Sequence, residues 1–322
     1  MADGYAALRT GAAAVWLQRD FVTASGPDAG VFLQGQLSQD VLGLRQDHSA
    51  WSWVLQPTGK VDALVRITRR ADDAFVLDTD RRWGEALVAR LGRFRLRSKL
   101  DLEVADWACL GLRGPEVRRL AASLGITVGG DLAAGPLAID ASWPGLPGVD
   151  LVAPTVEVPP GVALASGEDY EALRIEAGIP RMGAELDERT IPAETGLVPL
   201  TVDFNKGCYT GQELVARIDS RGSRVARHLR VLRIDGPAAA GATLHHGGQL
   251  YQGVQLYQGG REVGVLTSVA RVPAGAAAVS SGGSAEGWVG LGYVRRAVEP
   301  PATVLIGDGG PEARVEALPE AQ

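Results

Sequence analysis

The stretch "NKGCYTGQELVARIDSRG", residues 205–222, separates two regions of the chain that have different sequence patterns. Before it, amphipathic helical segments alternate with strand-like segments. After it, from Arg224 onward, short β-rich segments are separated by runs of glycine. Short strands joined by closely spaced glycine turns are typical of a small antiparallel barrel. The pattern therefore predicts one region over residues 1–222 and a C-terminal β-barrel domain over residues 223–322.

The region before this stretch has the pattern of an α+β fold. The predicted elements are, in order, a strand, turn and short helix (14–41), two strands around the turn "QPTGK" (51–70), a strand (73–80), an amphipathic helix (81–94), a strand pair (95–114) and a second helix (114–126). This β-α-β-β-α-β order predicts a sandwich of the ferredoxin-like kind.

Two local features complete the predicted elements. "SGEDYEALRIEAGIP", residues 166–180, predicts a helix that begins at a Ser166 cap and ends before Pro180. In the C-terminal region, "GGQLYQGVQLYQGG", residues 247–260, has the pattern of a local duplication that forms a hairpin. It is too short to indicate a repeat protein.

The composition bounds the class of protein. The chain has 322 residues, of which 46% are hydrophobic and 22% charged, as expected of a globular protein. No apolar run approaches the roughly 18 residues of a membrane span, and the first residues lack the layout of a signal peptide. We therefore expect a cytoplasmic protein without a membrane partner. The net charge of −6 argues against direct DNA binding, and contact with RNA rests only on local arginines.

Cys208 is one of only two cysteines, and it lies in a turn rich in glycine and positive charge. A thiolate is the reactive form of cysteine, and nearby cations favour it. Lys206 is two residues away, and Gly207 and Gly211 allow the backbone to bend and a partner to approach. We therefore expect a functional thiol with Lys206 beside it, the alternative being a small buried cysteine in a tight turn. Cys109, within an apolar strand, is expected to be a core residue.

Arginines follow Cys208 at short spacings. Arg217, Arg221 and Arg224 could bind an anion beside the cysteine, such as a folate glutamate tail or an RNA phosphate, because arginine binds anionic groups through two parallel hydrogen bonds. The alternative is a solvated charged surface. The histidines show no zinc-binding spacing, and the chain has neither a Walker loop nor a dinucleotide fingerprint, so no metal site is expected.

The motif "NKGCYTGQE" resembles the signature of the YgfZ family, the folate-binding relatives of the glycine-cleavage T-protein (aminomethyltransferase). Further blocks similar to that family follow in the same order. They are "FLQGQLSQDV" (32–41), "PTGKVDALVRI" (57–67), "LRSKLDLE" (96–103), "LRIEAGIPRMGAELDERTIPAETGL" (173–197), "VGVLTSVA" (263–270) and "LGYVRR" (291–296). The resemblance implies a T-protein-like fold, with two ferredoxin-like portions that divide near residues 105–140 and a C-terminal barrel around a folate-sized cleft.

The resemblance also implies a function. It suggests an accessory protein that binds tetrahydrofolate or a related reduced folate and supports the assembly or repair of iron–sulfur clusters, with indirect effects on tRNA modification. Iron–sulfur proteins or their assembly factors would then be its partners. The Lys-Gly-Cys-Tyr motif favours this role, because the T-protein lacks that cysteine. The alternative is an enzyme that transfers one-carbon units, as the T-protein does.

Individual site residues follow from the same resemblance. Where the T-protein has an acidic pair after a Gly-Gly turn, this chain has Asp62 followed by Ala63. Where it has a folate-contacting asparagine on the next strand, this chain has Asp78. Trp143 and Asp150 match the spacing of a pterin-binding tyrosine and glutamate, and a carboxylate can accept hydrogen bonds from the guanidine-like edge of a pterin.

Arg174 matches a folate-contacting arginine in the family. Its alternative role is an ion pair with Glu171 or Glu176. The predicted catalytic residues are thus Cys208, Lys206 and Asp62, and the predicted folate contacts are Asp78, Trp143, Asp150 and Arg174.

Overall fold

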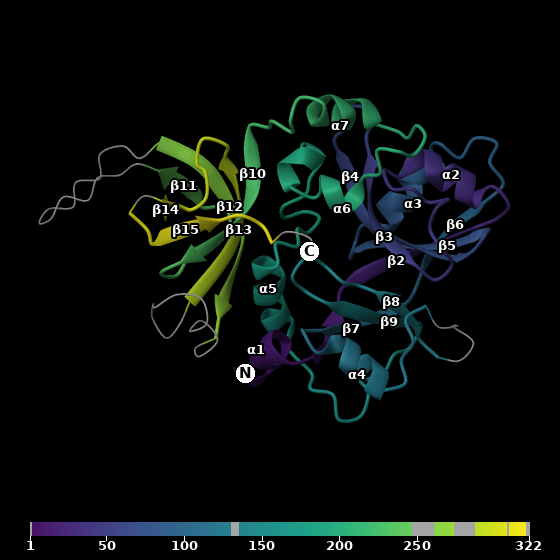
Figure 1. Ribbon diagram of the computed structural model, residues 1–322, viewed down its shortest axis with the longest axis horizontal. Coiled ribbons are helices and arrows are strands. Elements are labelled where there is room, and N and C mark those ends of the chain that lie inside the picture. The colour runs from purple at the N-terminus through teal and green to yellow at the C-terminus, as the bar shows by residue number, and fades with distance from the viewer. Residues whose placement is uncertain (1, 130–134, 247–260, 274–286, 308, 320–322) are drawn as a thin grey trace, which may run out of the picture.

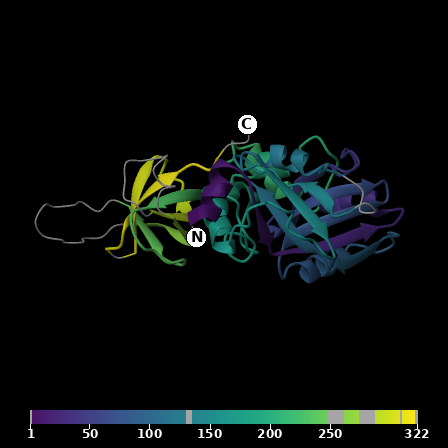
Figure 2. The ribbon, with the colours of Figure 1, turned by 90° about the horizontal axis from the view of Figure 1, so that it is seen from below.

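The computed structural model describes residues 2–129, 135–246, 261–273, 287–307 and 309–319. Two antiparallel sheets lie on one side of the molecule and a closed barrel on the other, with helix α5 (Gly167–Glu176) between them (Figures 1 and 2). The α+β class and the C-terminal antiparallel barrel are as predicted. The predicted hairpin at 247–260 lies outside the described residues.

The first sheet has five antiparallel strands, and two helices pack against one of its faces. Its strand order is β3 (Ser49–Leu55), β4 (Val61–Ala71), β5 (Ala74–Asp80), β2 (Arg19–Ser25) and β6 (Asp101–Ala105). Alternate residues of these strands, among them Val65 and Leu77, pack with apolar residues of α2 (Ala29–Gln36) and α3 (Gly84–Gly92). The hairpin predicted around "QPTGK" is the β3–β4 hairpin of this sheet.

The second sheet has four strands, in the order β1 (Ala13–Leu17), β7 (Ala108–Arg113), β9 (Gly148–Ala153) and β8 (Leu137–Asp140), with α4 (Val117–Ser123) packed against β9. Two strand predictions are corrected here. The single strand expected within 14–41 is two strands, because the chain leaves one sheet for the other at Gln18. The strand pair predicted at 95–114 is not a pair, since β6 joins the first sheet and β7 the second.

Helices α1 (Ala2–Thr10) and α5 join the sheets to the barrel. Helix α5 begins as predicted: Ser166 caps it and forms a capping box with Asp169, so two backbone N–H groups at the helix start are satisfied. Apolar residues of both helices, including Tyr5 and Ile175, pack against the outer face of barrel strands. Because this contact is buried and apolar, it stabilises the packing of the two helices against the barrel.

The barrel closes through six antiparallel strands. Their order is β10 (Arg227–Ile234), β13 (Gly287–Arg295), β12 (Arg261–Val272), β11 (Thr243–His246), β14 (Ala302–Ile306) and β15 (Glu312–Glu316). Its interior is filled by Leu, Ile and Val side chains. Gly292 allows the backbones of β13 and β12 to approach closely, because a Cβ there would lie 2.6 Å from the carbonyl oxygen of Val265.

Three short helices connect α5 to the barrel. They are η2 (Pro192–Thr195), α6 (Val198–Thr201) and α7 (Gln212–Asp219), and the motif loop that contains Cys208 lies between α6 and α7. Helix α7 lies at the upper edge of the molecule in Figure 1, just before the chain enters β10. No described helix has both the length and the apolar character required to cross a membrane.

Candidate functional site

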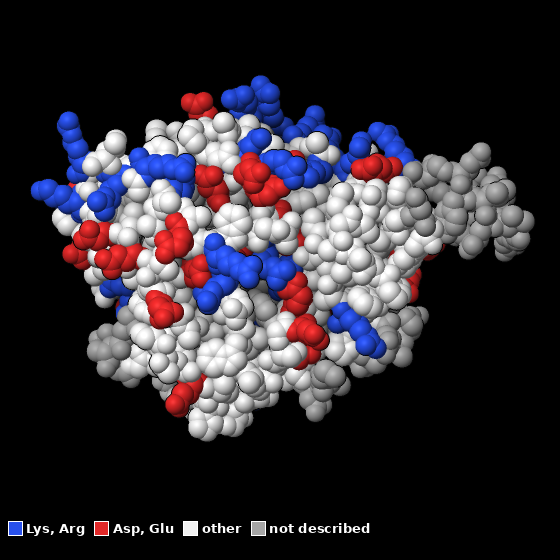
Figure 3. Space-filling model, turned by 180° about the vertical axis from the view of Figure 1, so that it is seen from behind, with Lys and Arg blue, Asp and Glu red and all other residues white. Residues whose placement is uncertain are grey.

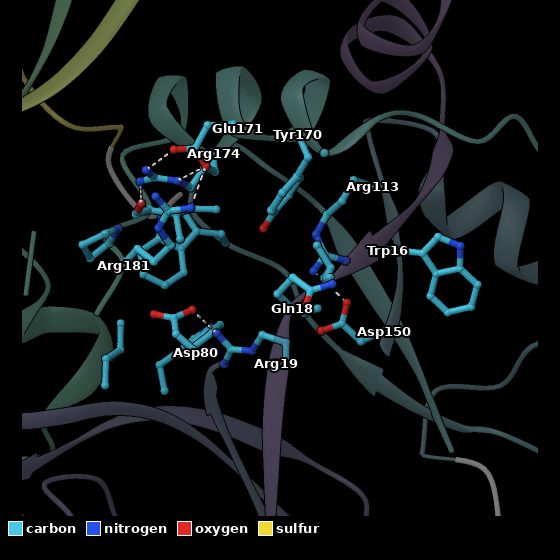
Figure 4. Close-up of a pocket in the computed structure, with 18 residues that line it drawn as sticks. Trp16, Gln18, Arg19, Asp80, Arg113, Asp150, Tyr170, Glu171, Arg174 and Arg181 are labelled. Atoms are coloured by element: carbon cyan, nitrogen blue, oxygen red, sulfur yellow. Dashed lines mark hydrogen bonds and ion pairs between the residues drawn. The ribbon is translucent and has the colours of Figure 1, made fainter. Parts of the chain in front are cut away.

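A cleft of about 180 Å³ lies where the two sheets meet α5 and the segment that follows it (Figure 4). Its wall combines aromatic and charged side chains from both sheets and from α5. The lining residues on which the argument depends are Trp51, Trp143, Asp150, Tyr170, Arg174 and Arg181. The fold brings three of the predicted folate contacts to this one cleft: Trp143, Asp150 and Arg174.

Two tryptophans form the apolar part of the wall. The rings of Trp51 and Trp143 meet edge to face, with centroids 5.2 Å apart and an interplanar angle of 83°. Trp143 Nε1 donates to the Ala177 carbonyl oxygen at 3.2 Å, which fixes the ring. The guanidinium groups of Arg19 and Arg66 lie 5.7 and 5.6 Å from the Trp51 ring centroid, within the range of cation–π attraction.

A buried row of alternating charges lies along and beneath the cleft. Asp78 accepts hydrogen bonds from Arg19 Nη2 at 2.5 Å and from Arg66 Nε at 2.9 Å. Asp150 lies 2.7 Å from Arg66 Nη2 and 2.7 Å from Arg113 Nη2. The row thus runs Arg19, Asp78, Arg66, Asp150, Arg113, and each buried charge has an opposite charge beside it.

Asp150 and Asp78 differ in their access to the cleft. Burial acts to raise the pKa of Asp150, but Arg113 and then Arg66 outweigh it and lower that pKa. Asp150 lines the cleft, and among the described residues its buried Oδ1 receives no hydrogen bond of good alignment although Arg113 is close. Asp78 is fully buried and does not line the cleft; it lies beneath it and holds two arginines.

Arg174 lines the cleft, but its donors are engaged by the protein itself. Its guanidinium donates to both carboxylate oxygens of Glu171, at 2.7 and 2.5 Å, and to Ser268 Oγ at 2.7 Å in the barrel. It also reaches the Ile179 carbonyl oxygen at 2.9 Å and the buried Glu185 at 3.3 Å. Arg174 therefore ties α5 to β12, and the ion pair with Glu171 is the alternative that the sequence left open.

The loop that carries Cys208 lies apart from this cleft, because none of residues 205–212 lines it. Cys208 is exposed, whereas Cys109 is buried as predicted. The Lys206 ammonium donates to three carbonyl oxygens at the end of α2: those of Gln34 and Leu37 at 2.6 Å and that of Gln39 at 2.8 Å. Its three N–H donors are thus directed to these carbonyl groups. The catalytic role of Cys208 and Lys206 stays a prediction.

The charge state of Lys206 reflects two opposing influences. Burial lowers its pKa to about 8, while Asp40 and then Asp203 favour the charged form. The three carbonyl oxygens favour it further, because the C-terminal end of a helix carries partial negative charge and attracts cations. Lys206 therefore acts as a cationic cap on α2.

Two glycines allow the motif loop and the start of α7 to approach the β3–β4 turn closely. Gly211 has φ 82°, and a Cβ there would lie 2.4 Å from the Gln56 carbonyl oxygen. Gly59, also at φ 82°, would place a Cβ 2.4 Å from Leu214 Cβ. Only glycine suits a position that has a positive φ and leaves no room for a Cβ. The Thr210 N–H donates to the Gly35 carbonyl oxygen at 3.1 Å, which adds a contact with α2.

Asp62 lies outside the cleft and is paired with Arg90. Its Oδ2 accepts from Arg90 Nε at 2.5 Å, and Arg90 also donates to the Leu55 carbonyl oxygen at 2.5 Å. Ala63, at the position of the second T-protein acid, packs in the core of the first sheet. Asp62 is absent from the cleft wall, so neither residue places an acid there.

Reasoning from the sequence missed several residues of the cleft. Trp51 and Arg113, which line the cleft, were not identified. Arg66 of the charge row was also missed, although it stands in the apolar run "VDALVRI" and a charged residue in a buried strand requires a partner. The cleft wall is shared by distant segments, so no local pattern indicated it.

The arginines that follow Cys208 are exposed. Arg217 lies on α7, and Arg221 and Arg224 follow its end. Figure 3 shows Lys and Arg side chains gathered along the upper edge of the molecule, the edge that carries α7 in Figure 1. Among the described residues, no group of three or more His, Cys, Asp or Glu side chains has a metal-binding arrangement.

Comparison with solved structures identifies the class of fold. The aminomethyltransferase T of the glycine cleavage system from Bartonella henselae aligns with 99% of this chain and 88% of its own, with a TM-score of 0.77 and 20% identity. This likeness shows that the protein has the aminomethyltransferase fold, as predicted. No family model matches the sequence.

Sequence comparison places the chain more narrowly. It is 32% identical over 215 residues to the tRNA-modifying protein YgfZ of Klebsiella pneumoniae, an alignment that covers 62% of this chain and 65% of that protein, slightly less than two thirds of its length. It is 29% identical to the aminomethyltransferase of Rubrobacter xylanophilus, over 92% of this chain and 80% of that protein. The chain is thus a relative of the YgfZ proteins and of the T-proteins, and the resemblance inferred from its motifs is confirmed.

Proposed function

We propose that this protein binds a reduced folate, tetrahydrofolate or a related form, in the cleft beside α5. The observation that carries the proposal is the wall of that cleft. Trp51 and Trp143 offer aromatic surfaces, and Asp150 offers a buried carboxylate oxygen without a well-aligned hydrogen bond. A pterin presents a flat ring and a guanidine-like edge, which these two groups complement.

The size of the cleft agrees with part of a folate. A volume of about 180 Å³ suits a fused bicyclic ring, and sites for complete ligands of this class are larger. The remainder of the molecule would extend toward solvent. The half-exposed Arg181 at the edge of the cleft is suited to an anionic tail, because its present ion pair with Glu171 is a long one of 3.2 Å. When bound, a reduced folate supplies a carrier for one-carbon units.

The second part of the proposal concerns Cys208. The thiol is exposed on a loop outside the cleft, where another protein can reach it. We assign it the accessory role in iron–sulfur cluster assembly or repair that the Lys-Gly-Cys-Tyr motif suggests, with iron–sulfur proteins or their assembly factors as partners. Effects on tRNA modification would follow indirectly, through enzymes that depend on such clusters. The name of the Klebsiella pneumoniae relative, a tRNA-modifying protein, supports a link to tRNA modification.

Isothermal titration with tetrahydrofolate tests the folate proposal. Binding should be observed with the intact protein and should weaken in Trp143→Leu, which removes an aromatic plane from the cleft. Trp107→Leu is the matched control, because Trp107 packs against Phe21 with ring centroids 5.8 Å apart and does not line the cleft. The proposal is wrong if no folate, with one glutamate or several, gives a heat of binding, or if the two variants lose affinity equally.

A complementation experiment tests the role of the thiol. Cys208→Ser should retain tetrahydrofolate binding but fail to support iron–sulfur enzymes in cells that lack their own accessory protein. Cys109→Ala, which removes the buried cysteine, is the control and should support them. Full complementation by Cys208→Ser would contradict the proposed role.

A one-carbon transferase is the second candidate function. The Rubrobacter xylanophilus aminomethyltransferase favours it, because the similarity extends over most of both chains. The position of the acids opposes it: Asp62 is paired with Arg90 away from the cleft, and Ala63 is in the core. Release of ammonia from an aminomethyl-lipoyl carrier in the presence of tetrahydrofolate distinguishes the two functions.

A further inference from the structure

One end of the barrel carries a concentration of basic side chains. Residues of β10 alternate between the barrel interior and α5, and Leu232 and Ile234 face the interior. His228 and Arg230 precede them on the same face of the strand, and both are half-buried. The neighbouring strand β13 places Val294 opposite His228, so Arg296, two residues beyond, lies diagonally across from His228.

These three residues are close enough to interact. Diagonal neighbours on one face of an antiparallel pair are about 7–8 Å apart, within reach of long side chains. The Arg296 N–H donates to the Ala226 carbonyl oxygen at 3.0 Å, which extends the pairing of the two strands past their assigned ends. Burial, then repulsion from Arg230 and Arg296, lowers the pKa of His228, while Glu194 acts in the opposite direction.

Among the described residues, the acid that acts on His228 is Glu194, and it is already engaged elsewhere. Glu194 is paired with Arg227, on the other face of β10, at 3.0 Å. Among the residues that the structure describes, the Arg230 guanidinium makes one hydrogen bond, a long one of 3.4 Å to the Leu229 carbonyl oxygen. In the described part of the chain, neither Arg230 nor Arg296 has a carboxylate within ion-pair distance. A half-buried guanidinium without a counter-ion is unfavourable, and like charges on neighbouring strands add to the cost.

We propose that His228, Arg230 and Arg296 form a binding site for a phosphate group at this end of the barrel, separate from the cleft. Arginine can donate two hydrogen bonds to one phosphate, and a protonated His228 imidazole adds a further donor from the same face of β10. A bound phosphate would neutralise the repulsion within the cluster. The net charge of the whole chain is −6, so this positive cluster is a local departure from its surroundings.

Titration of the histidines by NMR tests this site, because the chain has only four. Added inorganic phosphate should raise the pKa of His228, since an anion favours the protonated ring. His48, which is exposed just before β3, should not respond. In Arg230→Met without phosphate, the ring of His228 should titrate at a higher pH, because a repulsive charge has been removed. The affinity for phosphate, read from the shift of the His228 pKa, should fall by about tenfold or more.

A matched variant and a second ligand sharpen the experiment. Arg314→Met, which removes an exposed arginine already paired with Glu316, should leave the response of His228 unchanged. Replacing inorganic phosphate by a nucleoside monophosphate, and then by a short oligonucleotide, identifies the source of the phosphate by which of the three binds most tightly. An equal response of His48 and His228, or an unchanged response in Arg230→Met, would overturn the proposal.

Discussion

The Lys206 ammonium lies 2.6 Å from the carbonyl oxygen of Leu37, the C-cap residue of helix α2. Two further carbonyl oxygens, those of Gln34 and Gln39, complete its surroundings. The lysine of the Lys-Gly-Cys-Tyr motif therefore holds the motif loop onto α2. Cys208, two residues later, is exposed.

Replacing Lys206 by methionine should loosen the loop. Three charge-assisted hydrogen bonds are lost and three carbonyl groups lose their donor, so the free energy of unfolding should fall by about 1–3 kcal/mol. Hydrogen exchange should accelerate at the Thr210 amide, which donates to Gly35. Urea unfolding and exchange measured on Lys206→Met provide the two readings.

Lys60→Met is the control for this variant. Lys60 lies in the facing β3–β4 turn, and no side-chain hydrogen bond or ion pair ties it to the described residues. It should show neither effect. Equal exchange at Thr210 in the two variants would mean that Lys206 does not hold the loop.

The two cysteines should differ in reactivity. Burial raises the pKa of Cys109 well above its usual value, with Asp150 adding to the effect, and Cys109 is inaccessible in the folded protein. Cys208 is exposed. Iodoacetamide should therefore modify Cys208 first in the native protein and Cys109 only after unfolding, as mass spectrometry of peptides can establish. Modification of both residues at similar rates before unfolding would contradict this assignment.

Much of the fold could be predicted from the periodicity of hydrophobic residues and from the turn and capping residues in the sequence. The Ser166 cap, the hairpin at "QPTGK" and the glycine-separated strands of the barrel are local signals, because each depends on residues that are neighbours in sequence. The chain passes from one sheet to the other at Gln18 and again between β6 and β7. No local signal predicted these crossings, because packing between distant segments decides which sheet a strand joins.

The candidate site was predictable only in part, for the same reason. Trp143, Asp150 and Arg174 were found through a family resemblance, and the exposure of Cys208 agrees with its glycine-rich surroundings. The arginines that surround the carboxylates come from three strands of two sheets, and their pairing depends on tertiary structure. Lys206 was assigned to its neighbour in sequence, Cys208, but its partners are about 170 residues away along the chain.

The buried charge row should be sensitive to loss of one member. Arg66→Met leaves Asp78 and Asp150 without their shared partner, so the free energy of unfolding should fall by about 3–5 kcal/mol. Arg119→Met removes an exposed arginine paired with Glu116 and should cost less than about 1 kcal/mol. Chemical denaturation compares the two. Similar small losses would show that the row contributes little to stability.

Stability should fall in acid because two carboxyl groups titrate at lower pH in the folded state. The pKa of Asp150 and that of Glu171 are both lowered, against the effect of burial, by Arg113 and Arg66 in the first case and by Arg174 and Arg181 in the second. A group whose folded pKa is depressed contributes stability that is complete above its unfolded pKa, about 4, and that is lost as the pH falls through the folded pKa.

The acid dependence can be assigned with one variant. Glu171→Gln removes one titrating group of the partly exposed pair and should flatten the fall in unfolding free energy below about pH 4. Glu116→Gln, at an exposed ion pair on α4, should leave the slope nearly unchanged. An identical slope in the intact protein and in Glu171→Gln would contradict the assignment.

The protein should not release ammonia from an aminomethyl-lipoyl carrier at the rate of an ordinary enzyme, roughly 1 per second or more. The reason is the placement of the acids after the β3–β4 turn. Asp62 is held by Arg90 outside the cleft, and Ala63 is buried among the apolar residues of the first sheet. Ala63→Asp should therefore not create activity: it would place a carboxylate in the core and should destabilise the fold.

The assay is ammonia release with tetrahydrofolate present, with a true T-protein as the positive control. Turnover near 1 per second by the unmodified protein would show that the transferase function is correct and that the cleft supplies its acid from another residue, for which Asp80 and Glu171 on the wall would be the first candidates.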